Sequence, residues 1–271
     1  MFEDIKDVLL ITDMDGTFLP SCKIPGQRSL KAIEDFQKKG GKFSIATGRA
    51  LQAAQQYFDT FTVNCPAVLC NGGMVYDINN KKQINDIYVP TYTKEIVKTV
   101  LKDNPDVGCE VLTLDTVYVP QMTPMEQKHN EICKVIPVRC PVDEIKGEWY
   151  KVLFAIEPEK MDRLISYVSA HNWSGVDFVR SAHEYYEILP QNISKGAGIN
   201  AIRNEYRDRD LTIVAVGDYN NDIEMLEAAD LAVCPSNAVE EVKKVADVVL
   251  GVSCEEDAIA AVIDLIYSKL K

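Results

Sequence analysis

The sequence predicts an α/β fold in which a parallel sheet, covered by helices on both faces, is interrupted by an α+β region. Short apolar runs alternate with amphipathic segments near both ends of the 271-residue chain, which is the pattern of β-α-β units. These apolar runs are continuous, as expected for strands buried on both faces. The middle of the chain differs, because its expected strands alternate in polarity and its loops are rich in Pro and Gly.

The parallel region begins with the apolar run at residues 8–12, which predicts a buried strand. A helix over 28–39 follows, because Leu30, Ile33 and Phe36 recur at helical spacing. The next expected elements are a strand over 43–47, a helix over 49–58 and a strand over 67–70. Near the C-terminus we expect strands over 211–216, 231–234 and 248–250, with helices through Met225, over 239–245 and over 255–270.

The middle region predicts an α+β domain inserted into the parallel one. Its expected strands cover 84–89, 107–113, 116–120, 150–156, 176–180 and 185–189, and its expected helices cover 93–102, 125–134 and 159–170. We therefore assign residues 1–83 and 190–271 to a parallel-sheet core and residues 84–189 to the inserted domain. Arg180 and His183 fall near the end of the insertion, where solvated loop positions are the simpler interpretation.

Composition and charge exclude several classes of function. The net charge is −12 and no basic run is present, which argues against a nucleic-acid partner. The acidic N-terminus and the short apolar run after it fit neither a signal peptide nor a membrane span. None of the eight cysteines forms a C-x-x-C pair, so we expect reduced thiols and a cytoplasmic location rather than a zinc or redox motif.

Polar residues that could carry chemistry follow the expected core strands. Ligands of an open parallel sheet bind beyond the carboxyl ends of its strands, so residues there should lie close together. The residues at these positions are Asp13-Met14-Asp15, Thr47-Gly48-Arg49, Asn71-Gly72-Gly73 and Gly217-Asp218-Tyr219-Asn220-Asn221-Asp222, and Lys195 opens a helix just before the strand at 211–216. Carboxylates, a hydroxyl, backbone N–H groups and a lysine are what magnesium-assisted phosphoryl transfer needs.

Each feature also has a purely structural interpretation. Asp13 and Asp15 could form an acidic turn, although their repulsion is more simply offset by a divalent cation. Thr47 could be a helix N-cap, and Asp218 could be a turn residue. Lys195 is less easily explained in this way, because a cation is unfavourable at the N-terminus of a helix.

The chain resembles the haloacid dehalogenase superfamily in four motifs: Asp13-x-Asp15-Gly16-Thr17, Thr47-Gly48-Arg49, Lys195-Gly196 and Gly217-Asp218-x-x-Asn221-Asp222. Their order and the long insertion resemble the Cof-like phosphatases of that superfamily, which carry a type IIB cap domain. The resemblance implies a Rossmann-like core with the insertion as a cap that covers the site and reads the leaving group. Tyr219 and Gln191-Asn192-Ile193 depart from the frequent pattern, but neither departure touches a catalytic position.

The resemblance also implies a role for each motif residue. Asp13 is the nucleophile that forms an aspartyl-phosphate, and Asp15 is the general acid and base. Mg²⁺ is held by Asp13, by the backbone carbonyl of Asp15 and by Asp218. The phosphate is held by Met14, Thr47, Gly48, Lys195 and Asn221. Asp222 and Arg49 orient these groups without binding the metal or the phosphate themselves. Lys195 takes part in catalysis by neutralising charge on the phosphate.

The reaction implied is Mg²⁺-dependent hydrolysis of small phosphorylated metabolites, with phosphosugars as the leading class, by a monomer or weak homodimer. Three alternatives stay open at this point. A sugar phosphomutase of the same superfamily shares the nucleophile and cap, and an inactive phosphate-binding regulatory protein shares the fold. A dehydrogenase is suggested by the partial dinucleotide fingerprint at 196–201, with Asp218 downstream, but that interpretation leaves Asp13 and Asp15 unexplained.

Overall fold

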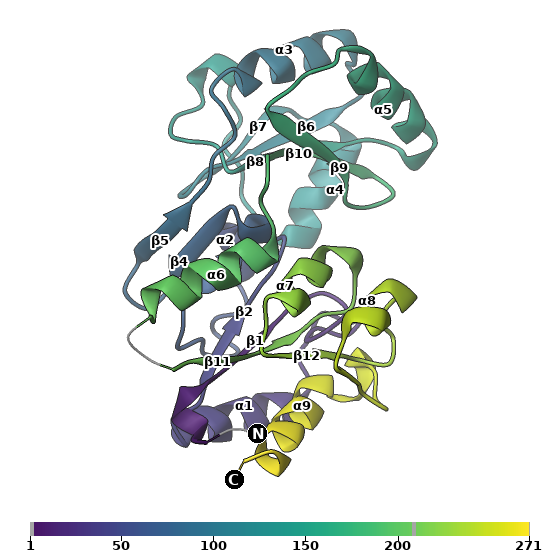
Figure 1. Cartoon of the computed structure of the whole chain (residues 1–271). Coiled ribbons are helices and arrows are strands. Elements are labelled where there is room, and N and C mark those ends of the chain that lie inside the picture. The colour runs from purple at the N-terminus through teal and green to yellow at the C-terminus, as the bar shows by residue number, and fades with distance from the viewer. Residues whose placement is uncertain (1–2, 208–209, 271) are drawn as a thin grey trace. The chain divides into compact units, whose positions relative to one another are not determined.

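A computed structural model describes residues 3–207 and 210–270, and these divide into two compact units. The core unit comprises the described residues up to Gly48, then Tyr57–Asn85, and the described residues from Ser194 onward. The cap unit comprises Arg49–Gln56 and Asp86–Ile193. Figure 1 labels the elements of both units.

A five-stranded parallel sheet forms the centre of the core unit, as the sequence predicts. Its order is β13 (Val248–Val249), β12 (Leu231–Cys234), β11 (Thr212–Val216), β1 (Val8–Thr12) and β2 (Lys42–Ile45). A parallel bridge between Ala46 and Val68 places β3 (Ala67–Leu69) beside β2. All five residues of β1 are buried, which accounts for its continuous apolar run.

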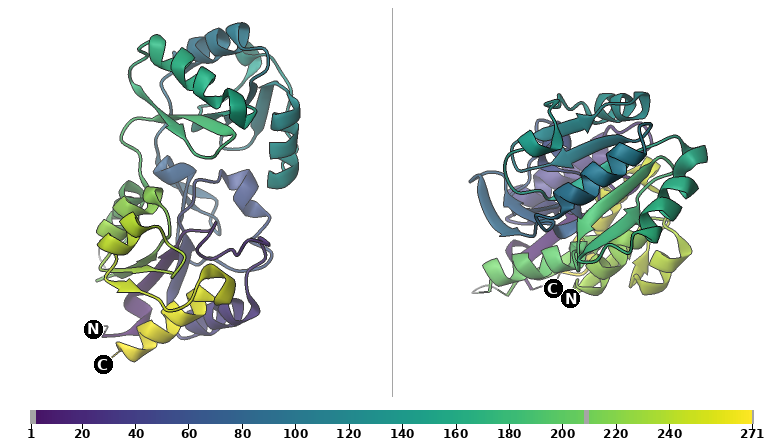
Figure 2. Two further views of the ribbon diagram at one scale, coloured as in Figure 1. Left: turned by 90° about the vertical axis from the view of Figure 1, so that its right-hand side faces the viewer. Right: turned by 90° about the horizontal axis from the view of Figure 1, so that it is seen from above.

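Helices pack on both faces of this sheet. On one face, α1 (Gln27–Lys38) and α9 (Ala258–Ser268) lie side by side in the views of Figures 1 and 2, and Arg28 pairs with Asp264 at 2.7 Å. On the other face, Leu9 and Ile11 of β1 share a buried cluster with residues of α6 (Lys195–Glu205), α7 (Ile223–Glu227) and α8 (Glu240–Val245). The core is therefore a three-layer α/β sandwich.

A second, smaller sheet extends the core unit and corrects one expectation. β4 (Met74–Asp77), which the sequence analysis lacks, pairs antiparallel with β3 and lies between β3 and β5 (Lys82–Asp86) in a three-stranded sheet. Residues 84–89 were expected to begin the insertion as a strand. The strand instead covers 82–86 and pairs with β4. β4 itself follows a turn in which Cys70 and Asn71 reverse the chain with positive φ angles of 50° and 56°.

The cap unit is an antiparallel sheet with helices on both faces. Its order is β7 (Val117–Gln121), β6 (Gly108–Leu112), β8 (Lys151–Ala155), β10 (Tyr185–Pro190) and β9 (Val176–Arg180). Residues of α3 (Thr93–Asp103) and α5 (Met161–Ala170) share one buried cluster with the sheet. From the other face α4 (Pro124–Cys133) contacts β6 and β8, and there Glu110 lies 3.6 Å from His129.

One segment groups differently from its assignment by sequence. The helix expected over 49–58 is the shorter α2 (Leu51–Gln55), and residues 49–56 belong to the cap unit rather than the core. Hydrogen bonds explain this grouping. The Gln52 amide donates to the carbonyls of Thr113 and Leu114 at 3.2 and 2.8 Å, and the Gln56 amide donates to that of Cys133 at 3.0 Å. Such side-chain contacts leave no periodic signal in the sequence.

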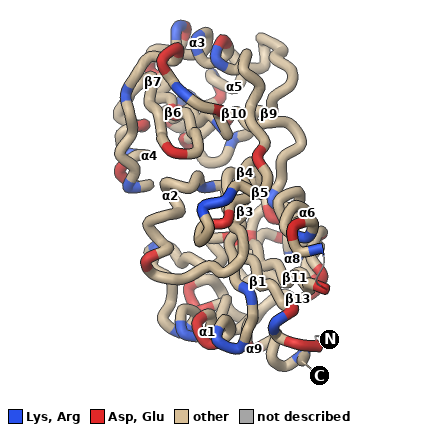
Figure 3. Tube along the Cα trace, turned by 90° about the vertical axis from the view of Figure 1, so that its left-hand side faces the viewer, with Lys and Arg blue, Asp and Glu red and all other residues tan. Residues whose placement is uncertain are grey.

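Charged residues are interspersed along the chain (Figure 3), in keeping with the lack of a basic run in the sequence. Within 3–207 and 210–270, no helix has the length and apolar character that a bilayer crossing requires.

The glycines that open α6 are explained by packing. A Cβ atom on Gly198 would lie 2.4 Å from Val68 Cγ1, and one on Gly196 would lie 2.4 Å from the Glu224 carbonyl oxygen. These glycines allow α6 to approach β3 and α7 closely. The partial dinucleotide fingerprint is therefore a packing feature, and its first glycine stands inside a helix rather than at the end of a strand.

We expect Gly198→Ala to lower the free energy of unfolding by about 1–2 kcal/mol. Alanine favours a helix over glycine by about 1 kcal/mol. Overpacking usually costs about 1–3 kcal/mol, and the 2.4 Å approach to the stiff Val68 side chain places the cost in the upper part of that range, at about 2–3 kcal/mol. Gly251→Ala is the matched control, because a Cβ there meets nothing within 4 Å. Urea unfolding of both variants checks this, and a Gly198 variant as stable as wild type would contradict the packing argument.

Candidate active site

The ends of three neighbouring strands, β11, β1 and β2, bring the predicted residues to one edge of the core sheet. Thr12, the last residue of β1, is in register with Val216 of β11 and Ile45 of β2. The next residue, Asp13, donates its N–H to the Val216 carbonyl at 2.8 Å. The side chains that follow β1 and β11 therefore start from adjacent backbone positions.

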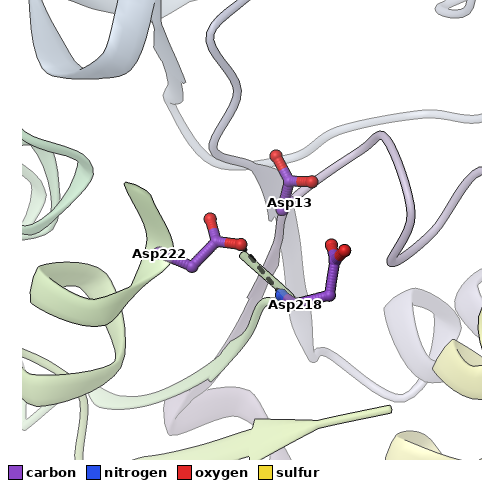
Figure 4. Close-up of side chains that lie close together, drawn as sticks. All are labelled: Asp13, Asp218 and Asp222. Carbon is purple, nitrogen blue, oxygen red and sulfur yellow. Dashed lines mark hydrogen bonds between the residues drawn. The ribbon is translucent and has the colours of Figure 1, made fainter. Parts of the chain in front are cut away.

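Three carboxylates meet at this edge (Figure 4). Asp13, Asp218 and Asp222 each offer one oxygen, and these oxygens lie within 4.8 Å of one another. Asp13 and Asp222 are buried, and Asp218 is partly exposed. Asp13 and Asp218 were predicted as metal ligands. Asp222 was predicted as a supporting residue, and here it lies within the same cluster.

Lys195 joins two of these carboxylates. Its Nζ donates to Asp13 Oδ1 and to Asp222 Oδ1, each at 2.6 Å, and the side chain is fully buried. Lys195 is the first residue of α6, with Ser194 Oγ capping the helix by accepting from the Ala197 N–H. A lysine at this position opposes the helix dipole, so the carboxylates account for its presence.

Asp222 is bonded through both of its oxygens. Besides the Oδ1 contact with Lys195, its Oδ2 accepts from the backbone N–H groups of Asp218 and Tyr219 at 2.8 and 3.0 Å. The side chain thus fixes the loop that carries Asp218 and holds the lysine at the same time. These contacts favour a positioning role over direct metal ligation.

Asp218 is held by residues from the first motif. Thr17 Oγ1 donates to Asp218 Oδ1 at 2.5 Å. Gly16 has φ +89°, and a Cβ on it would lie 2.6 Å from Asp218 Oδ2, so only glycine allows this approach. Asn237 Nδ2 donates to the Gly16 carbonyl at 2.8 Å and supports the turn. Sequence reasoning gave no site role to Thr17 or Asn237, and only Thr17 had a signal, as part of the first motif.

Burial dominates the electrostatics of this cluster. Burial raises the pKa of Asp13 well above its usual range, although the Lys195 ammonium opposes this. Burial also raises the pKa of Asp218 to about 6, against the hydrogen bond from Thr17. Burial disfavours the charged form of Lys195, but Asp13 and Asp222 outweigh it and raise the pKa of the lysine.

The donor set fits a hard divalent cation. The cluster presents three carboxylates and one ammonium, so it carries two uncompensated negative charges when all groups are ionised. Carboxylate oxygens are the ligands that Mg²⁺ prefers, and a divalent charge balances this excess. The same charge would favour the anionic form of Asp13, which burial disfavours.

Asp15 has a different environment. Its Oδ1 accepts a hydrogen bond from Lys23 Nζ at 2.7 Å, and both side chains are partly exposed. Its side chain is not one of the three in the carboxylate cluster. Metal ligation by its backbone carbonyl stays a prediction. Met14, between the two aspartates, is fully buried, and its carbonyl accepts from the N–H groups of Phe18 and Leu19 at 3.1 and 2.6 Å.

The predicted phosphate-binding residues at the end of β2 are linked by Asn71, which the sequence analysis placed at this edge without giving it a role. Thr47 is buried, and its carbonyl accepts from the Asn71 N–H at 3.0 Å. Asn71 Oδ1 accepts from Asn221 Nδ2 at 3.3 Å, and a Cβ on Gly48 would lie 3.1 Å from that oxygen. The signal for Asn71 was its place before two glycines, with φ 56° in the structure.

Three residues from the sequence analysis lie in the cap unit. Arg49 groups with the cap unit, and its supporting role stays a prediction. The Arg180 guanidinium donates to the carbonyls of Ala182 and His183 at 3.1 Å each, which is a local loop arrangement.

The sequence of this chain is similar to those of known proteins. The sequence model of the haloacid dehalogenase-like hydrolase family matches residues 10–263. The chloroplastic endoribonuclease YBEY of Arabidopsis thaliana is 27% identical over 276 residues, which cover 95% of this chain and 46% of that protein, so the chain spans about half the length of that relative. The 5-amino-6-(5-phospho-D-ribitylamino)uracil phosphatase of Bacillus subtilis is 24% identical over 266 residues, which cover 96% of both chains.

The fold has close structural counterparts. The crystal structure of a haloacid dehalogenase-like hydrolase from Bacteroides thetaiotaomicron superposes with a TM-score of 0.85 at 21% sequence identity. The match covers 95% of this chain and 98% of that one. Both units of the present structure therefore occur together in a known fold.

We expect Lys195→Met to lower the free energy of unfolding by about 3–5 kcal/mol at neutral pH in EDTA, because it leaves Asp13 and Asp222 buried without their cation. The matched control is Lys82→Met, which removes an exposed pair with Glu205 at 2.9 Å and should cost less than about 1 kcal/mol. Guanidinium unfolding measures both. Equal losses in the two variants would show that the buried network does not support the fold.

Proposed function

Because the chain belongs to the haloacid dehalogenase-like hydrolase family, we propose that it is a Mg²⁺-dependent phosphatase that forms an aspartyl-phosphate on Asp13. The observation that carries the proposal is the contact of buried Lys195 with Asp13 and Asp222, beside Asp218, at the carboxyl edge of the core sheet. This set combines a nucleophile, a cation and a candidate metal site in one place.

The chain is a phosphoric monoester hydrolase by its family and by its similarity to several relatives that are named as phosphatases. We propose small organic phosphate monoesters as substrates, with phosphosugars as the leading class. Support comes from the relative in Bacillus subtilis, whose name gives a phosphorylated ribityl chain as its substrate. The phosphate of such a ligand is a dianion, which suits the Lys195 ammonium.

Asp13 acts as the nucleophile in this proposal. Its carboxylate attacks phosphorus, the bond from phosphorus to the leaving oxygen breaks, and hydrolysis of the acyl phosphate follows. Lys195 holds Asp13 Oδ1 at 2.6 Å, so the carboxylate is oriented before substrate arrives. Asp222 fixes the lysine from its other side, also at 2.6 Å.

Asp15 moves the protons. It gives a proton to the leaving alcohol and later takes one from the water that attacks the aspartyl-phosphate. The Thr47 hydroxyl and the N–H groups of Met14 and Gly48 hold phosphate oxygens, with Asn221 and Lys195 as further donors. Arg49 and Asp222 orient these groups and do not contact the phosphate themselves.

Mg²⁺ would be held by Asp13, Asp218 and the Asp15 carbonyl, and when bound it would neutralise charge on the phosphoryl oxygens. Thr17 and Gly16 place Asp218 for this purpose, through the 2.5 Å hydrogen bond and the close approach described above. We further propose a cytoplasmic enzyme that acts on free metabolites as a monomer or weak homodimer.

Asp13→Asn should reduce phosphate release by at least about 10³-fold while the fold is kept, because an amide cannot serve as the nucleophile. The assay follows a panel of phosphorylated metabolites with Mg²⁺, measuring inorganic phosphate against substrate loss. Asp264→Asn, an exposed carboxylate on α9, is the matched control and should retain full activity. Activity of the Asp13 variant near the wild-type rate would refute its role, and substrate loss without phosphate release would point to a mutase.

Asp218→Asn should weaken Mg²⁺ binding by about 10-fold or more, since one of the anionic ligands becomes neutral. Calorimetric titration with MgCl₂ measures this directly, without reference to turnover. Asp264→Asn again serves as the control and should bind like wild type. Unchanged affinity in the Asp218 variant would remove this residue from the metal site.

A further inference from the structure

We propose that Lys23 is a positioning residue that holds the Asp15 carboxylate in place for proton transfer to the leaving group. The inference rests on the proposed function, in which Asp15 is the general acid and base. Lys23 lies outside the four motifs. Its Nζ donates a 2.7 Å hydrogen bond to Asp15 Oδ1.

The backbone between the two residues folds back on itself. The Gly16 N–H donates to the Leu19 carbonyl at 3.1 Å, and Asp15 and Leu19 form a bridge. The Lys23 N–H then donates to the Pro20 carbonyl at 2.8 Å, which closes a second turn. These two turns return the chain so that the lysine side chain reaches the carboxylate eight residues earlier.

A distant segment anchors the second turn. Ser21 donates to Glu255 Oε1 through both its N–H, at 2.8 Å, and its hydroxyl, at 2.5 Å. Glu255 lies in the 3₁₀ helix Cys254–Glu256, just before α9, so the turn is tied to the body of the core unit. The backbone of Lys23 is therefore held in place independently of its contact with Asp15.

Stability does not explain this arrangement. The side chains of Lys23 and Asp15 are 49% and 36% exposed, and an ion pair so open to water contributes little to folding. Lys23 also adopts φ 58°, a left-handed conformation that is unfavourable for a residue with a Cβ. Because the pair adds little to stability, the consequence of the contact is that it fixes the position of the Asp15 carboxylate.

The chemical need for such a residue follows from the geometry of proton transfer. A general acid works only when its oxygen lies within hydrogen-bond reach of the leaving oxygen. The hydrogen bond from Lys23 to Oδ1 restricts the rotation of the Asp15 side chain. Lys23 acts through Asp15 and needs no contact with the reacting atoms.

The leaving group provides the test. An alkoxide must be protonated as it departs, whereas p-nitrophenolate needs no proton. We expect Lys23→Gln to lower kcat/KM about tenfold for an alkyl monophosphate that wild type hydrolyses, and less than about twofold for p-nitrophenyl phosphate. Lys23→Arg, which keeps the charge and donors, should restore the alkyl rate to within about threefold. Lys82→Gln, from the exposed pair with Glu205 in the same unit, should change neither substrate.

The outcomes separate this inference from the function on which it rests. Asp15→Asn serves as the reference and should show the same dependence on the leaving group. If it does and Lys23→Gln does not, the inference is wrong and the proposed function stands. Equal losses on both substrates in Lys23→Gln would mean that the lysine attracts the phosphate instead, which also overturns the inference. Wild type without turnover on any phosphate monoester of the metabolite panel would refute the proposed function itself.

Discussion

The buried ammonium of Lys195 is the interaction on which the arrangement of the site depends. It links the first strand, the start of α6 and the loop after β11 through two hydrogen bonds of 2.6 Å. Removing three charged groups from water is costly, and their mutual contacts must offset that cost. The short distances and the further N–H bonds to Asp222 show how this is achieved. A network of this kind tolerates little displacement of any one member.

The acidic residues of the site differ in their contacts and therefore in their roles. Asp222 is saturated by donors from the protein, so it organises its neighbours. Asp218 is placed by the Thr17 hydroxyl and by the absence of a side chain at Gly16. Asp15 lies at the surface beside Lys23, where a carboxylate can exchange protons with solvent. One sheet edge thus provides three electrostatic environments for one type of side chain.

Much of this could be predicted because strand ends carry sequence signals. The alternation of apolar runs and amphipathic segments predicted the parallel sheet, and the rule that strand ends share an edge brought Asp13, Asp218 and Lys195 together. The order of the motifs predicted the family, which the match over residues 10–263 confirmed. Signals of this kind are local in the sequence, so they survive without any knowledge of packing.

The features that were not predicted depend on contacts between distant residues. The hydrogen bond from Asn237 to the Gly16 carbonyl joins residues 221 positions apart, and no local sequence pattern near either residue predicts it. Residues 49–56 group with the cap unit through amide side chains that bind backbone carbonyls, which leaves no hydrophobic pattern. β4 was overlooked because a strand of four residues after a glycine-rich turn resembles a loop.

The split construction of the core has a consequence for how the protein is made. β1 pairs with β11, and Val8 is in register with Thr212, so the centre of the parallel sheet cannot form until Thr212 has been synthesised. The sheet of the cap unit uses only residues 108–190, so all of its strands are synthesised before that partner. Until then the apolar first strand lacks one of its two neighbours, and its exposed edge is open to wrong pairing. Assembly of the carboxylate cluster of Asp13, Asp218 and Asp222 is therefore among the last events in biosynthesis.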